Sequence, residues 1–276
     1  MASLAQQRRT LPGFGLGLGV TITYLSLIVL LPLATMLLRS LGNGPAFWWQ
    51  AVSSARVLAA LRLSLGASMA AAAVDVIFGL IIAWVLVRYR FIGRRWFDAL
   101  IDLPFALPTA VAGITLSALY AGNGWLGQYL EPWGIKVAFT RVGVFVALVF
   151  VALPFIVRTV QPVLQDLDKE CEEAAATLGA SRWQTFRQVL WPSLAPALLT
   201  GFTMALARAV GEYGSVIFIA GNLPRVSEIA PLLITIKLEQ YDYVGAAAIG
   251  SAMLLLSFVL LLVLNLLQRR MLRVQR

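Results

Sequence analysis

Two strongly apolar regions of the chain flank the polar stretch D-L-D-K-E-C-E-E-A-A-A-T-L-G-A-S-R-W-Q-T-F-R-Q-V-L-W-P, Asp166–Pro192. Apolar residues recur at helical spacing in its first half, which predicts a short helix over about residues 168–178. Gly179 is suited to the positive φ that ends such a helix. Ser181 and Gln184 then form the capping-box pattern that opens a second helix. The stretch is therefore predicted to fold as a helical hairpin outside the lipid.

Composition places the chain in a membrane. Of its 276 residues, 60% are hydrophobic and only 13% are charged, whereas about a quarter are charged in a typical soluble domain. Histidine is absent and Cys171 is the single cysteine, which argues against imidazole catalysis, a metal site, a cofactor site and an internal disulfide. A net charge of +9 could suggest nucleic acid, but basic residues in membrane proteins more often mark the cytoplasmic side. We expect no nucleic-acid partner.

Six stretches are apolar and long enough to cross a bilayer, which requires about 20 helical residues. They run over about 14–38, 57–87, 99–120, 142–160, 194–219 and 244–267. The first is too long for a signal peptide and lacks a small-residue cleavage site, so it is expected to be a retained span. The prediction is an all-α membrane protein with one domain over 1–276, comprising an N-terminal span at 14–38, a core of about 57–267 and the hairpin at 166–192.

Lys and Arg predict the orientation. With the N-terminus inside, 14 of the 22 basic residues fall in inner segments and seven in outer ones, with Arg208 inside a span. This bias follows the positive-inside rule. Both termini, and the hairpin between spans four and five, are therefore expected to be cytoplasmic.

Two interpretations of the hairpin follow from its residues. It could lie on the membrane surface, stabilised by Trp183 and Phe186. Alternatively, the small side chains of Ala174, Ala175 and Ala176 could let its first helix seat closely against a partner protein, whereas a helix that rests on lipid prefers large apolar residues. The alanines favour a partner.

The spacing of residues in the hairpin resembles that of a known motif. Glu173-Ala174-Ala175, Gly179, Val189 and Pro192 resemble the EAA loop of type I ABC importer membrane subunits, although Trp191 stands where that family has Leu. The resemblance implies that the helix inserts into a cleft of a cytoplasmic ATPase, where Glu173 pairs with a basic residue. The predicted ATPase-coupling residues are Glu172, Glu173, Ala174, Ala175, Leu178 and Gly179.

Longer segments narrow the resemblance to sulfate/thiosulfate permease subunits of the T type. They are R-Y-R-F-I-G-R at 88–94, D-L-P-F-A-L-P-T-A-V-A-G at 102–113, P-F-I-V-R-T-V-Q-P-V-L at 154–164 and G-E-Y-G-S-V-I-F-I-A-G-N at 211–222. The resemblance implies sulfate or thiosulfate import across a bacterial inner membrane. It also implies three partners: an ATPase dimer, a W-type permease subunit and a periplasmic sulfate/thiosulfate-binding protein. The chain has no G-x-x-x-x-G-K-[ST] phosphate loop, so we expect a non-catalytic subunit.

Three ionisable residues fall within predicted spans. Arg208 and Glu212 lie four residues apart in the fifth span, and Asp75 lies in the second. Such groups are costly at membrane depth and normally face protein or water. Arg208 and Glu212 either pair with each other or across helices, or they lie beside the path of an oxyanion, to which Arg208 would offer positive charge. Asp75 is a candidate for the same two roles.

Glycine and proline residues mark possible breaks in two spans. Gly211 and Gly214 flank Glu212 and are either close-packing contacts or a gate. Pro104 and Pro108 could bend the third span, unless neighbouring groups satisfy the freed backbone.

Asp98 and Asp102 resemble a paired-carboxylate site, since they lie one helical turn apart. Basic residues at 94 and 95 are close in sequence. Ion pairing is therefore the expected role of the two carboxylates.

The alternatives are a permease for another oxyanion such as molybdate, or an ATP-independent secondary transporter or channel. Secondary transporters often contain inverted repeats with matching broken helices. We find no convincing repeat, and neither secondary transport nor a channel requires an EAA loop.

Overall fold

The computed structural model describes residues 14–274, and all regular secondary structure within them is helical. Five helices are long and apolar enough to cross a membrane, judged by length and composition. They are Phe14–Ser40, Ala55–Arg88, Arg141–Asp166, Arg182–Val210 and Tyr243–Arg270. Arg8, Arg9 and Arg276, which enter the count of basic residues, lie outside the described residues.

The long helices are joined by short helical elements. The first crossing comprises α1 (Phe14–Leu25), the π-helical turn η1 (Ser26–Leu30) and α2 (Leu31–Ser40); the longest rods are α4 (Ala55–Arg88), α9 (Arg141–Asp166), α12 (Trp191–Val210) and α15 (Tyr243–Val274). The hairpin comprises α10 (Lys169–Thr177), α11 (Arg182–Thr185) and the π-helical turn η3 (Phe186–Leu190). The remaining elements are α3 (Pro45–Val52), α5 (Arg94–Ile101), α6 (Leu103–Ala106), α7 (Thr109–Tyr120), α8 (Gly127–Leu130), the 3₁₀ turn η2 (Glu131–Trp133), α13 (Val216–Ile219) and α14 (Ala230–Glu239).

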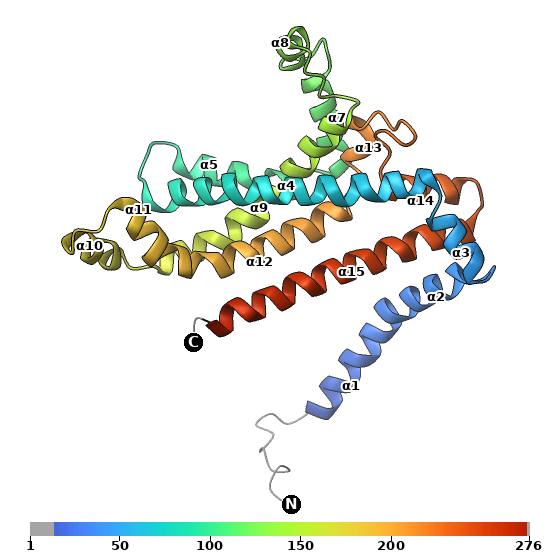
Figure 1. Cartoon of the computed structure of the whole chain (residues 1–276), viewed down its shortest axis with the longest axis horizontal. Helices are drawn as coiled ribbons and strands as arrows, with labels where there is room; N and C mark the ends of the chain where they lie inside the picture. The colour runs from blue at the N-terminus through green and yellow to red at the C-terminus, as the bar shows by residue number, and fades with distance from the viewer. Residues whose placement is uncertain (1–13, 275–276) are drawn as a thin grey trace, which may run out of the picture.

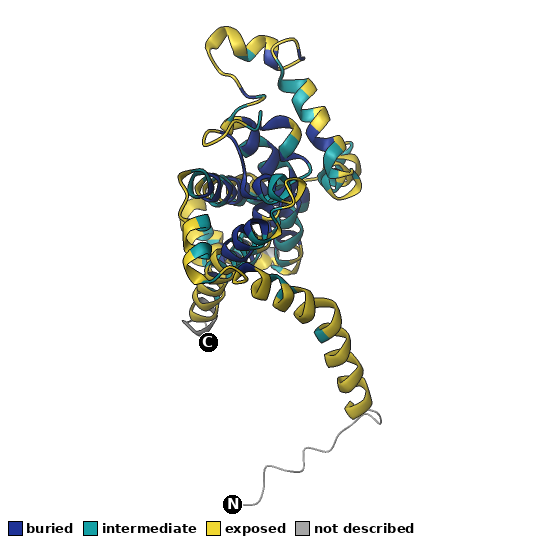
Figure 2. Ribbon diagram, turned by 90° about the vertical axis from the view of Figure 1, so that its right-hand side faces the viewer, coloured by how far each residue is buried: buried dark blue, intermediate teal, exposed yellow. Residues whose placement is uncertain are grey.

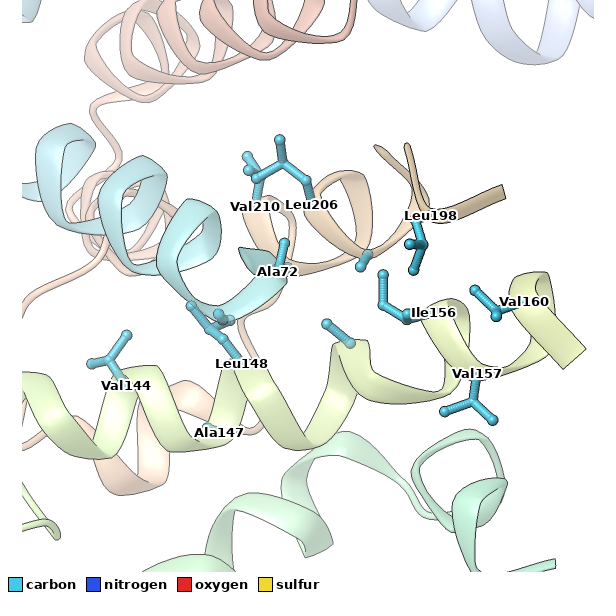
Figure 3. Close-up of a cluster of buried hydrophobic side chains, with 14 of the residues drawn as sticks. Ala72, Val144, Ala147, Leu148, Ile156, Val157, Val160, Leu198, Leu206 and Val210 are labelled. Atoms are coloured by element: carbon cyan, nitrogen blue, oxygen red, sulfur yellow. The ribbon is translucent and has the colours of Figure 1, made fainter. Parts of the chain in front are cut away.

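The core lies where α4, α9 and α12 pack together (Figure 3). Ile156 of α9 is fully buried at this crossing. A Cβ added at Gly79 of α4 would lie 2.6 Å from Ile156 Cγ2, and one added at Gly201 of α12 would lie 3.2 Å from Ile156 Cα. Glycines on both flanking helices therefore allow the backbones to approach closely around one isoleucine, as small residues do in membrane bundles.

The first crossing lies apart from this core. Helix α2 lies along α15, whereas α1 has no buried residue and extends away from the bundle (Figures 1 and 2).

The rods run roughly side by side, so the bundle has two ends (Figure 1). Helices α5, α10 and α11 lie at one end, together with the last turn of α4 and the C-terminal end of α15. Helices α3 and α14 lie at the other end, and α13 lies beside α7 on one side of the bundle. Figure 1 thus places the hairpin at the end where α4 and α9 finish.

The third predicted span, about 99–120, is not one helix. It consists of α5, α6 and α7, and Leu107 before Pro108 is extended, with φ −80° and ψ 134°. A residue that precedes proline avoids the helical region, and proline donates no backbone hydrogen bond. Of the two alternatives for these prolines, the structure shows the bend, at Pro108, and the prediction of one continuous span was wrong. Helix α7 has 12 residues and rises about 18 Å, which is short of the roughly 30 Å hydrocarbon core.

The fifth predicted span, 194–219, is also divided. Helix α12 ends at Val210, and α13 begins only at Val216. The glycines at 211 and 214 fall in this break. Arg208 therefore lies in the last turn of α12, and Glu212 lies beyond the end of the helix rather than inside it.

Candidate functional site

The first helix of the hairpin ends as the sequence predicts. Gly179 has φ +79°, which is the left-handed region. Its N–H donates to Ala176 O at 3.0 Å, and the N–H of Ala180 donates to Ala175 O at 3.0 Å. These two bonds form a Schellman motif, which satisfies the last carbonyls of α10 and reverses the chain.

The second helix of the hairpin begins with the predicted capping box. The N–H of Gln184 donates to Ser181 Oγ at 3.3 Å, and the N–H of Ser181 donates to Gln184 Oε1 at 2.7 Å. The ring of Trp183 stacks on that of Phe186 with centroids 5.7 Å apart. Phe186 packs on the bundle core, so it anchors the hairpin to the membrane-embedded part of the chain.

The tip of the hairpin is apolar and open to solvent. Leu178 is 89% exposed, and Glu173 and Ala174 are exposed on the same short helix, with Ala175 half-buried. A leucine at this exposure loses the free energy of burial, about 1.5–3 kcal/mol, unless another molecule covers it. The structure thus leaves five of the six predicted coupling residues accessible: Glu173, Ala174, Ala175, Leu178 and Gly179.

Glu172, the remaining predicted coupling residue, faces the bundle. Its Oε1 lies 2.6 Å from Nη2 of Arg88, the last residue of α4. Only 10% of the Arg88 side chain and 27% of the Glu172 side chain are exposed. Arg88 was not among the predicted coupling residues, although it stands at the start of R-Y-R-F-I-G-R, directly after a long apolar run.

A second candidate site lies at the break after α12. Arg208 Nη1 lies 2.5 Å from Glu212 Oε2, so the predicted pair is formed. Glu212 Oε1 also accepts from the N–H of Ser215 at 2.9 Å and from its hydroxyl at 2.8 Å. Glu212 is buried, whereas 32% of the Arg208 side chain is exposed. The carboxylate therefore holds the break together, while part of the guanidinium remains accessible.

The two broken elements meet each other. A Cβ at Gly214 would overlap the side chain of Thr109 at the start of α7, and a Cβ at Gly113 would overlap the backbone of Ser215. The Ser117 hydroxyl also donates to Phe218 O at 2.9 Å. Irregular backbone at membrane depth occurs where it is buried in protein or lines a water-filled cavity. Close packing thus explains Gly214, whereas an added Cβ at Gly211 would approach only the carbonyl oxygen of Ala207, at 4.0 Å.

Asp75 stands apart from this pair. It is fully buried in α4, and within residues 14–274 neither carboxylate oxygen has a hydrogen-bond partner. The structure does not join it to Arg208 or Glu212 in an ion pair.

The paired carboxylates at the hairpin end of the bundle bind an arginine. Arg158 of α9 donates from Nε and Nη2 to the two oxygens of Asp102, at 2.8 and 2.7 Å, and from Nη1 to Asp98 at 2.7 Å. The expected ion pairing is present, but its centre is Arg158 rather than the neighbours at 94 and 95. This fork fastens α5 and α6 to α9, and bidentate geometry is the strong form of such pairs.

Comparison with known proteins identifies relatives of the whole chain. The family described as "Binding-protein-dependent transport system inner membrane component" matches residues 75–273. The chain is 48% identical over 263 residues to "Sulfate transport system permease protein CysT" of Salmonella typhimurium, covering 95% of each chain. It is 50% identical over 250 residues to the protein of the same name from Synechocystis, covering 91% of this chain and 87% of that one.

A solved structure has the same fold. A chain of a bacterial ABC transporter involved in the import of the acidic polysaccharide alginate superposes with a TM-score of 0.77 at 15% identity, covering 93% of this chain and 94% of that chain. At this identity the likeness concerns the fold alone, which is that of type I ABC importer permeases.

Proposed function

Because the chain belongs to the family of binding-protein-dependent transport system inner membrane components, we propose that it is the membrane permease of an ATP-driven sulfate importer. The observation that carries this proposal is the 48% identity to a sulfate transport permease over 95% of both chains. The chain forms part of the pore and hydrolyses nothing itself. Thiosulfate, with similar charge and shape, is the second substrate.

The hairpin supplies the attachment point for the energy source. Its ordered turn, its exposed Leu178 and its exposed Glu173 support docking into a cleft of a cytoplasmic ATPase. An ATPase dimer binds one such hairpin from each of two permease subunits. The second subunit is of the W type, and a periplasmic binding protein delivers the anion to the opposite end of the bundle.

Six crossings of a bacterial inner membrane fit the arrangement of the rods. The broken element α5–α7 counts as the third crossing, because α4 ends at the hairpin end and α9 begins at the opposite end (Figure 1). Both termini and the hairpin are then cytoplasmic, in keeping with the distribution of Lys and Arg.

The break after α12 is the best candidate for the anion path. Discontinuous helices near the midplane hold substrates in other transporters. The accessible part of Arg208 offers positive charge to an oxyanion, and Glu212 limits that attraction so that the anion can leave. A gate at Gly211 would use the open space around this glycine.

Transport in a reconstituted system tests the assignment. The chain, purified with its ATPase, W-type subunit and binding protein, is placed in proteoliposomes, and ATP-dependent uptake of labelled sulfate is measured. We expect uptake that thiosulfate inhibits and molybdate does not. Uptake without ATP, or uptake of molybdate in preference to sulfate, would contradict the proposal.

A substitution tests the path. Arg208→Ala should abolish most uptake while the complex still assembles and hydrolyses ATP. Arg39→Ala is the matched control, because Arg39 is an exposed arginine of the peripheral helix α2. Undiminished uptake by the Arg208 variant would remove this residue from the path.

A further inference from the structure

We propose that the Arg88–Glu172 ion pair is the link through which the first hairpin helix, α10, moves the transmembrane helix α4 together with the adjoining end of α9. This inference rests on the proposed function, since it describes how the docked ATPase would act on the bundle. It assigns Glu172 a role within the chain, distinct from the docking role of its neighbour Glu173.

Arg88 is placed to join three elements. It is the last residue of α4, and its guanidinium carbon lies 5.8 Å from the ring centroid of Trp84, one turn earlier in the same helix. Its Nη2 lies 2.6 Å from Glu172 Oε1 of α10, an ion pair by distance that lacks hydrogen-bond geometry, and donates to Leu167 O at 3.2 Å. Leu167 is the C-cap residue of α9. One guanidinium thus contacts the ends of two long helices and the middle of the hairpin helix.

This pair differs from a surface ion pair. The Arg88 side chain is only 10% exposed, so its charge is poorly screened by water and depends on a partner. The indole face of Trp84 adds a favourable cation–π contact and restricts the side chain. Pairs of this kind are costly to break from one side, because the remaining charge stays buried.

The pair also supplies a contact that α10 otherwise largely lacks. The main contacts of α10 run to α11 and η3, which belong to the same hairpin. Glu170 and Glu173, on the same helix, are exposed, whereas Glu172 turns toward the bundle. Helix α10 follows α9 in the chain after only two residues, whereas its connection to α4 is the ion pair with Arg88. A displacement of α10 by the ATPase would therefore reach α4 through Arg88.

The native Cys171 allows a direct test on the full chain in lipid nanodiscs. It is exposed, neighbours Glu172 and is the single cysteine of the sequence. A spin label on Cys171 should become markedly more mobile in Glu172→Gln and in Arg88→Gln. Glu170→Gln is the matched control, since it removes the same charge from an exposed position of α10, and it should leave the spectrum unchanged. This measurement requires no partner protein.

Transport by the assembled complex provides the second measurement. Glu172→Gln should still bind the ATPase, but the number of sulfate ions imported per ATP should fall by about two- to thirtyfold, the range for substitutions along a coupling path. The charge exchange Arg88→Glu with Glu172→Arg should restore only a small part of the loss, because a glutamate at position 88 can neither donate to Leu167 O nor make the cation–π contact with Trp84.

Two results would overturn the proposal: unchanged label mobility in Glu172→Gln, or an unchanged transport ratio in that variant. Unchanged mobility together with loss of ATPase binding would mean that Glu172 faces the ATPase. Failure of the wild-type complex to bind an ATPase would instead contradict the proposed function, while the label measurement would still report on the ion pair itself.

Discussion

A substitution at Gly179 measures how much the left-handed backbone conformation of this one residue contributes to the stability of the hairpin. Its φ is +79°, and an added Cβ would meet nothing within 4 Å. Replacement by alanine therefore introduces no clash, and its cost is the left-handed backbone itself, about 1–2 kcal/mol for an L-residue. This corresponds to a roughly 5–30-fold decrease in the population of the ordered turn relative to opened states.

Two comparisons make the test specific. Asparagine tolerates left-handed backbone, so Gly179→Asn should cost less than Gly179→Ala. Gly134 has φ +76° and equally open surroundings, but it lies in the loop between α8 and α9. Gly134→Ala should therefore carry a similar cost without affecting the hairpin.

Hydrogen exchange gives the readout. Amides near the end of α10, including those of Gly179 and Ala180, should exchange about 5–30 times faster in Gly179→Ala than in the native chain. Gly134→Ala should leave their exchange rates unchanged. ATP-driven sulfate uptake should fall in the same order, with alanine more affected than asparagine. Equal exchange rates in native and Gly179→Ala chains would refute the argument, because they would show that alanine adopts the left-handed conformation of this turn without a free-energy cost.

The remaining predictions concern stability in detergent. Gly79→Ala should destabilise the chain by about 1–3 kcal/mol, because the new Cβ would lie 2.6 Å from Cγ2 of the buried Ile156, whereas Gly66→Ala in the same helix meets nothing within 4 Å and should not destabilise. A hydrogen bond from Lys237 lowers the pKa of Asp242. Since both side chains are about a third exposed, Asp242→Asn should cost less than about 1 kcal/mol at neutral pH. Asp242 contributes this stability in its charged form, so the difference should disappear as the pH falls through its lowered pKa; thermal unfolding at several pH values checks this, and a difference that grows on acidification would contradict it.

The hairpin could be predicted because its signals are local. The Schellman turn at Gly179 and the capping box of Ser181 and Gln184 each involve residues within a few positions of one another. Their geometry depends little on the rest of the fold, and the structure contains both.

The broken spans were only partly predictable. Hydropathy counts apolar side chains but does not register the hydrogen bonds that Pro104 and Pro108 remove from the backbone. The break at 211–215 depends on Ser215 bonding to Glu212 and on α7 packing against it, which no local pattern reveals.

Ion pairs between residues that are distant in the sequence could not be predicted for a related reason. Arg88 and Glu172 were both visible as charges, but the packing of α4 beside α9 brings them together. The same packing explains why Arg158, rather than a sequence neighbour, binds Asp98. The sequence shows which charged residues need partners, and the packing of the helices determines which residues pair.

Site-specific photocrosslinking at Leu178 tests the central claim most directly. A benzophenone amino acid replaces Leu178, which is 89% exposed at the hairpin tip, or, as a control, Trp133, which is 84% exposed at the end of the 3₁₀ turn η2. In the assembled transporter, irradiation should join the ATPase to position 178 and not to position 133. A crosslink to the ATPase from position 133, or none from position 178 in a complex that imports sulfate, would contradict the account.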